Sequence, residues 1–274
     1  MNINKIVIEA GKTERHYWRD LWRYRELFYF LAWRDILVRY KQTLIGIAWA
    51  LIRPLLTMIV FTIVFGKLAK LPSGGAPYPI MVFAAMLPWQ FFATSFAEAG
   101  NSLIANANMI SKVYFPRLVM PTSAVIVSFV DFIISFVIML GLMLCYGFMP
   151  EIRIFTLPLF ICFAFTASLA VGLWIAALNV RYRDFRYIIP FIVQFGLYIS
   201  PVGFTSSIVP DKWRLLYSLN PMVGVIDGFR WAILGGDYQI YWPGFILSLL
   251  LVFIIFATGI VYFRKTEKTF ADVI

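Results

Sequence analysis

The chain has 274 residues, of which 61% are hydrophobic and 14% are charged, against about 45–50% and 25% in soluble domains. Its mean hydropathy is +0.81, which excludes a soluble domain. The apolar runs are continuous rather than alternating, which also excludes a β-barrel and leaves membrane-spanning helices. The net charge of +10 does not indicate a nucleic-acid partner, because the basic residues lie at the ends of the apolar runs.

No pattern in the sequence is typical of a catalytic or metal site. Residues 9–13 (EAGKT) resemble the end of a phosphate-binding loop, but Ile6 occupies the position of its first glycine. His16 is the only histidine, and Cys145 and Cys162 lie inside apolar runs. We therefore expect no metal, no cofactor and no nucleotide site in this chain. The first 20 residues also lack the apolar stretch and cleavage site of a signal peptide.

Residues 1–43 are expected to form a cytosolic tail followed by an amphipathic helix from about residue 19 to residue 41. Its charged face is predicted to hold Arg19, Arg23, Glu26, Arg34 and Lys41. Its opposite face is predicted to hold Leu21, Phe28 and Ala32. Such a helix lies in the membrane interface, and we expect a break near Asp35.

Six apolar segments follow, and each approaches the length of about 20 residues that a bilayer requires. The predicted spans cover residues 44–66, 80–99, 119–146, 154–180, 188–204 and 244–263. We assign residues 44–264 to one all-α transmembrane domain, and residues 265–274 to a second cytosolic tail. Residues 205–243 are more polar and are divided at Asn220-Pro221, which predicts two short interfacial or re-entrant helices on the outer side.

The distribution of positive charge sets the orientation. Most of the 24 Lys and Arg residues lie in the tails and in the loops between the second and third and between the fourth and fifth spans. Because Lys and Arg accumulate on the cytosolic side, both termini are predicted to be cytosolic.

Three charged residues are predicted to lie within the membrane region. Asp131 falls near the middle of the third span, where a carboxylate costs at least ~2.5 kcal/mol and requires a partner. Arg53, or an arginine of the outer segment, is a candidate partner. Asp131 has three open interpretations: a structural or gating role, a substrate contact, or a proton relay. Arg53 is expected to extend toward the cytosolic headgroups, and Glu98 to lie at the end of its helix.

Aromatic residues make up 18% of the chain. Most are expected to face lipid or to form interface belts, but aromatic rings also stack on sugar rings. The candidates for a glycan path or outer gate are Phe91, Tyr198, Phe204 and Trp231.

Several stretches, in this order, resemble the membrane subunit of ABC transporters that export polysaccharides. They are WRDILVRYKQTLIGIAWALIRPLL, FTIVFG, NSLIANANMISKVYFPRLVMP, NVRYRDFRYIIPF, YISPVGF and LNPMVGVIDGFRWAIL. The resemblance covers about residues 30–265. Arg53 is a departure, because the family commonly has a neutral residue there.

The resemblance implies a homodimer in the bacterial inner membrane, bound to two separately encoded ATPase subunits that hold ATP and Mg²⁺. It implies that the cargo is an undecaprenyl-linked polysaccharide, of O-antigen, capsule or teichoic-acid type, with O-antigen the nearest. It also implies that the chain is a transport subunit rather than an enzyme.

The resemblance further assigns roles to segments. The ATPase-coupling loop would contain Met109, Ser111, Lys112, Tyr114, Phe115 and Arg117. The gate helix near the point where substrate enters would contain Arg19, Arg23, Arg34, Arg39, Tyr40 and Lys41. Two short helices between residues 206 and 235 would close the conduit on the outer side.

Three alternatives remain open. The first is that the chain is the permease of another ABC exporter, for a drug or a small lipid. It would be a secondary transporter or channel if inverted repeats with matching broken helices were present; breaks occur at Pro88 and Pro201, without a convincing repeat. A membrane enzyme is disfavoured, because paired acids and metal-ligand sets are missing from the sequence.

Overall fold

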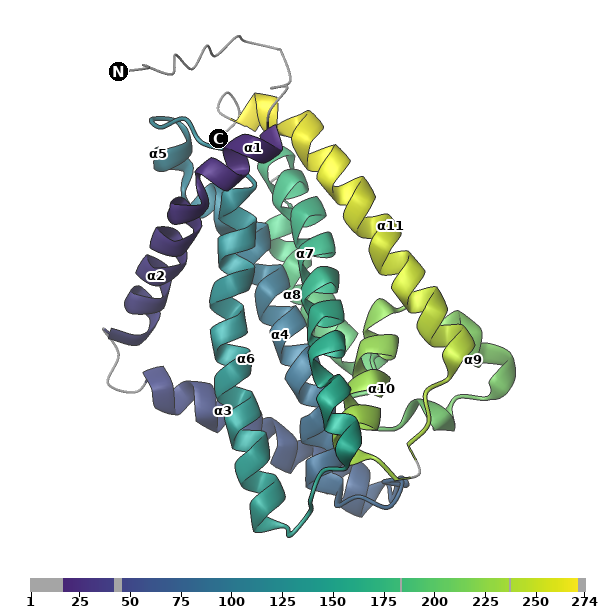
Figure 1. Ribbon diagram of the computed structural model, residues 1–274. Coiled ribbons are helices and arrows are strands. Elements are labelled where there is room, and N and C mark those ends of the chain that lie inside the picture. Colours follow the sequence, from purple (N-terminus) through teal and green to yellow (C-terminus); the bar gives the residue numbers. More distant parts are fainter. Residues whose placement is uncertain (1–16, 42–45, 183, 237, 271–274) are drawn as a thin grey trace.

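The computed structural model describes residues 17–41, 46–182, 184–236 and 238–270, and every secondary-structure element in this part of the chain is helical (Figure 1). The α-helices are α1 (Tyr17–Arg23), α2 (Arg25–Lys41), α3 (Gly46–Phe61), α4 (Tyr78–Ala105), α5 (Ala107–Ile110), α6 (Val119–Cys145), α7 (Leu157–Arg181), α8 (Phe185–Ile199), α9 (Asp211–Tyr217), α10 (Pro221–Leu234) and α11 (Trp242–Thr266). A π-helix (Thr62–Leu68) follows α3, and 3₁₀ turns lie at Ile152–Thr156, Ser206–Ile208 and Glu267–Thr269.

Within the described residues, four helical segments are long and apolar enough to cross a membrane. They are Tyr78–Ala105, Val119–Cys145, Ile152–Arg181 and Trp242–Thr269. They correspond to the second, third, fourth and sixth predicted spans, and α4 continues to Ala105 through residues that the sequence assigned to a cytosolic loop. The chain is therefore an integral membrane protein, and its described part is all-helical.

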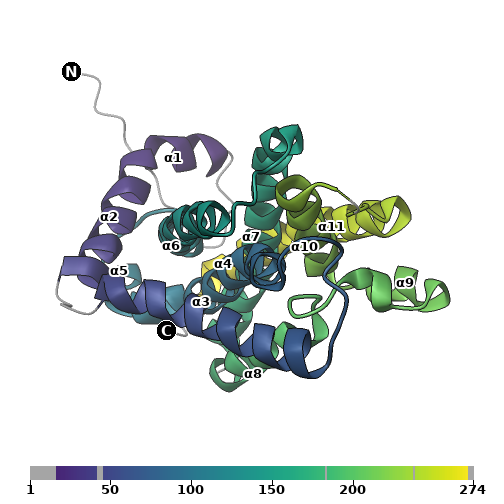
Figure 2. The ribbon, with the colours of Figure 1, turned by 90° about the horizontal axis from the view of Figure 1, so that it is seen from below.

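The first and fifth predicted spans are not among these four segments. Helix α3 changes to a π-helix at Thr62, and it runs across the end of the bundle rather than along it (Figures 1 and 2). Helix α8 has only 15 residues and ends at Ile199, just before Ser200-Pro201, because a residue that precedes proline disfavours the helical conformation. The six-span topology and the position of the termini stay predictions.

Helix α4 is the centre of the bundle, with α6, α7 and α10 packed around it (Figure 2). Its most apolar stretch is 83% buried, whereas the corresponding stretch of α11 is 22% buried. Small residues allow α4 and α7 to approach closely, as is common between membrane helices. A Cβ atom added at Gly172 of α7 would lie 2.9 Å from that of Ala99, and one at Gly100 would lie 2.8 Å from Ile175.

The amino-terminal helix is broken at Tyr24 and continues through Asp35, so the predicted break position was wrong. At Tyr24 the backbone turns between α1 and α2, whereas the Asp35 carboxylate pairs with the guanidinium of Arg34 at 2.8 Å within a continuous helix. Leu31 and Ala32 are buried where α2 packs along α6. Figure 1 shows α2 descending beside α6.

The segment between α8 and α11 contains two short helices, α9 and α10, as predicted, and Asn220 begins the second. The Asn220 side chain accepts a hydrogen bond from the Met222 backbone N–H at 3.0 Å, and Pro221 occupies the first turn. Both features are typical of a helix start. The placement of α9 and α10 relative to the membrane stays a prediction.

Candidate functional site

Four residues that the sequence singled out separately meet in one cluster. Arg39, near the end of α2, donates from Nη1 to the Asp131 carboxylate of α6 at 2.5 Å and from Nη2 to Glu98 of α4 at 2.6 Å. The Tyr40 hydroxyl donates to the other Asp131 oxygen. The partner of Asp131 is thus Arg39, and not Arg53 or an outer arginine as the sequence suggested. This cluster, which we call the α2 ion cluster, connects three helices.

The α2 ion cluster is only partly protected from solvent. The side chains of Asp131, Arg39 and Glu98 are 23%, 32% and 50% exposed. Burial and the hydrogen bond to Asp131 raise the pKa of the Tyr40 hydroxyl, so that it remains a neutral donor. One guanidinium faces two carboxylates, which lets Arg39 keep one partner while it loses the other.

A second contact connects α2 to the segment after α4. Nη2 of Arg34 donates to Oδ1 of Asn106 at 3.0 Å, and Asn106 precedes the one-turn helix α5. The other predicted basic residues of α1 and α2, Arg19, Arg23 and Lys41, are exposed. Arg53 is exposed on α3 and is not part of the α2 ion cluster.

The predicted coupling loop divides into an exposed part and an anchored part. Ser111, Lys112 and Tyr114 are exposed, whereas Phe115 is buried and Met109 is half-buried. The loop, together with the one-turn helix α5 (Ala107–Ile110), joins α4, which ends at Ala105, to α6, which begins at Val119. The exposed part of the loop is therefore continuous in the chain with two long helices.

Arg117 anchors this loop to the end of α11. Its backbone N–H donates to Oε1 of Glu267 at 2.7 Å, and its guanidinium donates to the Glu267 carbonyl oxygen. Arg264 of α11 lies over the ring of Tyr17 in α1, with its Cζ atom 4.5 Å from the ring centroid. The two ends of the described chain and the coupling loop thus meet on one side of the bundle, as Figure 1 shows for α1, α5 and the end of α11.

The four aromatic candidates for a glycan path lie in different surroundings. Phe91 is buried and packs against Phe129, Phe132 and Phe165. Tyr198 is 62% exposed on α8. Trp231 lies on α10 beneath Arg153, and Phe204 is half-buried in the turn after α8. They do not form one lining in the part of the chain that the structure describes.

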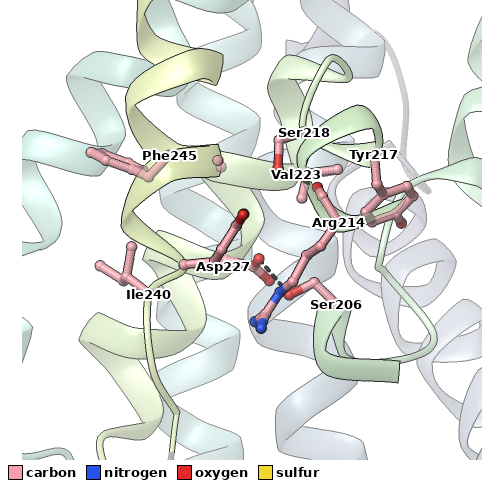
Figure 3. Close-up of a pocket in the computed structure, with 11 residues that line it drawn as sticks. Ser206, Arg214, Tyr217, Ser218, Val223, Asp227, Ile240 and Phe245 are labelled. Atoms are coloured by element: carbon pink, nitrogen blue, oxygen red, sulfur yellow. Dashed lines mark hydrogen bonds between the residues drawn. The ribbon is translucent and has the colours of Figure 1, made fainter. Parts of the chain in front are cut away.

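Arg230 of α10 is a buried cation, away from the α2 ion cluster, to which the sequence analysis assigned no role. Arg230 of α10 is 1% exposed and donates to the backbone carbonyls of Phe204 at 2.7 Å, Val202 at 2.9 Å and Met81 at 3.4 Å. Asp227 lies three positions earlier and accepts a hydrogen bond from Ser206 at 2.6 Å (Figure 3). Two opposite charges three residues apart on an apolar helix were the available signal.

Electrostatics at this second cluster are dominated by burial. Burial raises the pKa of the Asp227 carboxyl, while the hydrogen bond from Ser206 and the nearby Arg230 oppose that shift. Arg230 satisfies backbone oxygens that the turn at Pro201 leaves without helical partners, so it fixes the turn to α10 and α4. Among the described residues, no group of three or more His, Cys, Asp or Glu is arranged to hold a metal ion.

Comparison with known proteins agrees with this architecture. Residues 26–234 match the ABC-2 type transporter family of membrane proteins. The match extends from α2, through the α2 ion cluster and the coupling loop, to the end of α10. The chain belongs to this family.

Named relatives narrow the comparison. The chain is 29% identical over 216 residues to the O-antigen export system permease protein RfbA of Myxococcus xanthus, covering 77% of this chain and 82% of that protein. It is 25% identical over 256 residues to the protein of the same name from Klebsiella pneumoniae, covering 91% and 95%. It is also 20% identical over 244 residues to the polysialic acid transport protein KpsM of Escherichia coli, covering 86% and 91%.

Proposed function

We propose that this chain is the permease subunit of an ABC transporter that exports a lipid-linked polysaccharide, of O-antigen type, across the bacterial inner membrane. Two copies form the translocation path, and two separate cytosolic subunits bind and hydrolyse ATP with Mg²⁺. The undecaprenyl-linked end of the polymer enters first. The observation that carries the proposal is the nearly full-length match to a protein named as an O-antigen export permease, over 91% of this chain and 95% of that relative.

The geometry of the coupling loop supports an ATPase-docking role. Its exposed residues combine a cation, a hydroxyl and an aromatic ring in Lys112, Ser111 and Tyr114, a mixture that suits a protein interface. Phe115 and Arg117 hold the loop to the bundle, so a force applied at Lys112 reaches α4 and α6 rather than being absorbed locally.

The α2 ion cluster gives this movement a third element. Arg39 contacts both α4 and α6, so α2 follows these helices as long as both contacts persist. If ATP-driven closure shifts α4 relative to α6, Arg39 must release Glu98 or Asp131. Such an exchange between two discrete arrangements is how a small displacement becomes a change of state. The exposed cations Arg19 and Arg23 are placed to attract the anionic pyrophosphate of the lipid carrier.

A pull-down from native membranes in mild detergent tests the proposal. We expect a tagged chain to recover a stoichiometric soluble subunit with the G-x-x-x-x-G-K-[ST] motif, and cells lacking the chain to lose surface polysaccharide. The Lys112→Glu variant should recover less ATPase and export less polymer, because it reverses the charge of the exposed loop. Lys212→Glu, on α9, is the matched control and should behave as wild type.

Recovery of the chain without any ATPase would contradict the assignment to an ABC exporter. Recovery of the ATPase with unchanged surface polysaccharide would instead favour a permease for another cargo. Full ATPase binding and export by Lys112→Glu would contradict the assigned loop alone.

A further inference from the structure

A cavity of about 280 Å³ lies between α9, α10 and the turn at Ser206–Ile208. This volume lies just below the range of small-molecule sites, which begins near ~300 Å³, and suits a ligand the size of one sugar ring. Its polar lining includes Ser206, Ser207, Arg214, Asp227, Arg230 and Gln239. A narrower hollow adjoins it and shares Ser206, Arg214 and Asp227. Neither the α2 ion cluster nor the coupling loop contributes to this cavity.

Arg214 is the residue in this cavity whose hydrogen-bonding capacity is least used. Its Nε atom is buried and has no hydrogen-bond partner among the described residues. Its nearest acid, Asp211, lies 3.9 Å away and is 99% exposed, so their interaction is weak. The guanidinium is held by the ring of Tyr241, with Cζ 4.7 Å from the centroid. Figure 3 shows Arg214 extending toward Asp227 and Ser206.

The wall opposite Arg214 is rigid. The guanidinium of Arg230 is fixed by three backbone carbonyls, and Asp227 is fixed by Ser206. A carboxylate offers about four acceptor positions, so Asp227 retains capacity for hydroxyl donors. Two guanidinium groups and one carboxylate leave an excess of one positive charge among the described lining residues. The cavity therefore offers acceptors and hydroxyls for a polyol, together with a guanidinium that has one unused donor atom.

A sugar with a carboxylate group matches this combination. Its hydroxyls would meet Asp227, Ser207 and Gln239, and its planar carboxylate would meet the planar fork of Arg214. A neutral sugar offers no charged acceptor to the Arg214 guanidinium, whose Nε atom has no partner among the described residues, and a bare phosphate leaves the acceptor side unused. We propose that this cavity binds one acidic sugar unit, with Arg214 pairing with its carboxylate. The inference rests on the proposed function, because it identifies part of the exported polymer.

The test uses the full-length chain purified into lipid nanodiscs, with glucuronate, glucose and inorganic phosphate as probes. Saturation-transfer NMR should detect glucuronate binding, with glucose at least about tenfold weaker, because the charge-assisted hydrogen bond is lost. Phosphate should compete more weakly than glucuronate. Arg214→Gln should weaken glucuronate binding about tenfold and leave glucose binding unchanged, and Arg214→Lys should restore part of the loss.

Lys212→Gln is the matched control, because it removes one positive charge from the same helix without lining the cavity. Unchanged melting temperatures and size-exclusion profiles would show that the variants fold. Equal binding of glucuronate and glucose, phosphate competing as strongly as glucuronate, or wild-type binding by Arg214→Gln would each overturn the proposal. Binding to neither sugar would also overturn it.

The outcome is separable from the proposed function. Recovery of the ATPase and export of polymer do not depend on the sugar binding measured here. A chain that exports polymer and binds no acidic sugar refutes the cavity assignment and leaves the exporter intact. A chain that binds glucuronate but recovers no ATPase refutes the exporter instead.

Discussion

Two charged clusters in the described part of this protein, one around Arg39 and one around Arg230, use arginine in opposite ways. In the α2 ion cluster, Arg39 is 32% exposed and contacts two carboxylate side chains on different helices. In the second cluster, on α10, Arg230 is 1% exposed and contacts three backbone carbonyls. Side-chain partners can be exchanged when helices move, and water can replace them. Buried backbone oxygens cannot lose their donor without a large penalty. One arginine therefore allows movement, and the other prevents it.

The largest expected effect is at Arg230. Replacing it with alanine removes the arginine donor from the Val202 and Phe204 carbonyls and the nearby cation from Asp227, so we expect a loss of about 3–5 kcal/mol in the free energy of unfolding. Denaturant unfolding of the detergent-solubilised protein, followed by tryptophan fluorescence, measures it. Lys212→Ala, at an exposed position, should lie within about 0.5 kcal/mol of wild type. Equal stability of the two variants would remove the structural role of Arg230.

The apolar contact between α7 and α4 provides a comparison for the stability effects expected at the charged residues. Gly172→Leu forces a side chain against Ala99 where α7 meets α4, and overpacking of this kind costs about 1–3 kcal/mol. Gly141→Leu on α6 is the matched control, because a Cβ atom there meets nothing within 4 Å. The same unfolding measurement should separate the pair. Similar stabilities would mean that α4 and α7 are more loosely packed than described.

The contact between Arg39 and Asp131 should be weaker than either of these. A double-mutant cycle with Arg39→Ala and Asp131→Ala should give a coupling energy of about 1 kcal/mol, because both side chains are partly exposed. Export should fall by a larger factor than stability predicts if the contact also controls movement of α2. Unchanged export in both single variants would restrict this ion pair to a structural role.

The smallest effect is expected at Glu98. Its side chain is 50% exposed, so Glu98→Ala should change stability by less than about 0.5 kcal/mol. The cycle with Arg39→Ala should give a smaller coupling than the cycle with Asp131→Ala. If the coupling energy of Arg39 with Glu98 equalled or exceeded that with Asp131, Asp131 would not be the stronger partner of Arg39.

The long helices could be predicted because a long run of apolar residues is visible in the sequence and is also what a membrane-spanning helix requires. The third span was expected at residues 119–146, and α6 is Val119–Cys145. Helix ends that are set by packing against other helices were harder to predict from the sequence. Helix α4 continues to Ala105 because residues after Ala99 pack against α7, where Asn179 donates to the Gly100 carbonyl oxygen at 2.8 Å.

Partners distant in sequence were the least predictable. Asp131 required a counter-ion, but its partner Arg39 lies 92 positions away, and several arginines satisfied the same requirement. The direction of α3 also could not be predicted. A run of apolar residues indicates that a helix prefers lipid, but it does not determine the angle between that helix and the rest of the bundle. The cavity at Arg214 depends on three segments that meet only in the folded chain.

The distance between Arg39 and Asp131 has a consequence for biosynthesis. Translation proceeds at about 5–20 residues per second, so a stretch of 92 residues takes about 5–18 s to emerge. During that interval α2 has left the ribosome without the acid that later fixes its end. Helix α6, which carries Asp131, must be inserted before the end of α2 can settle, so a segment that is among the first to be synthesised adopts its place only later.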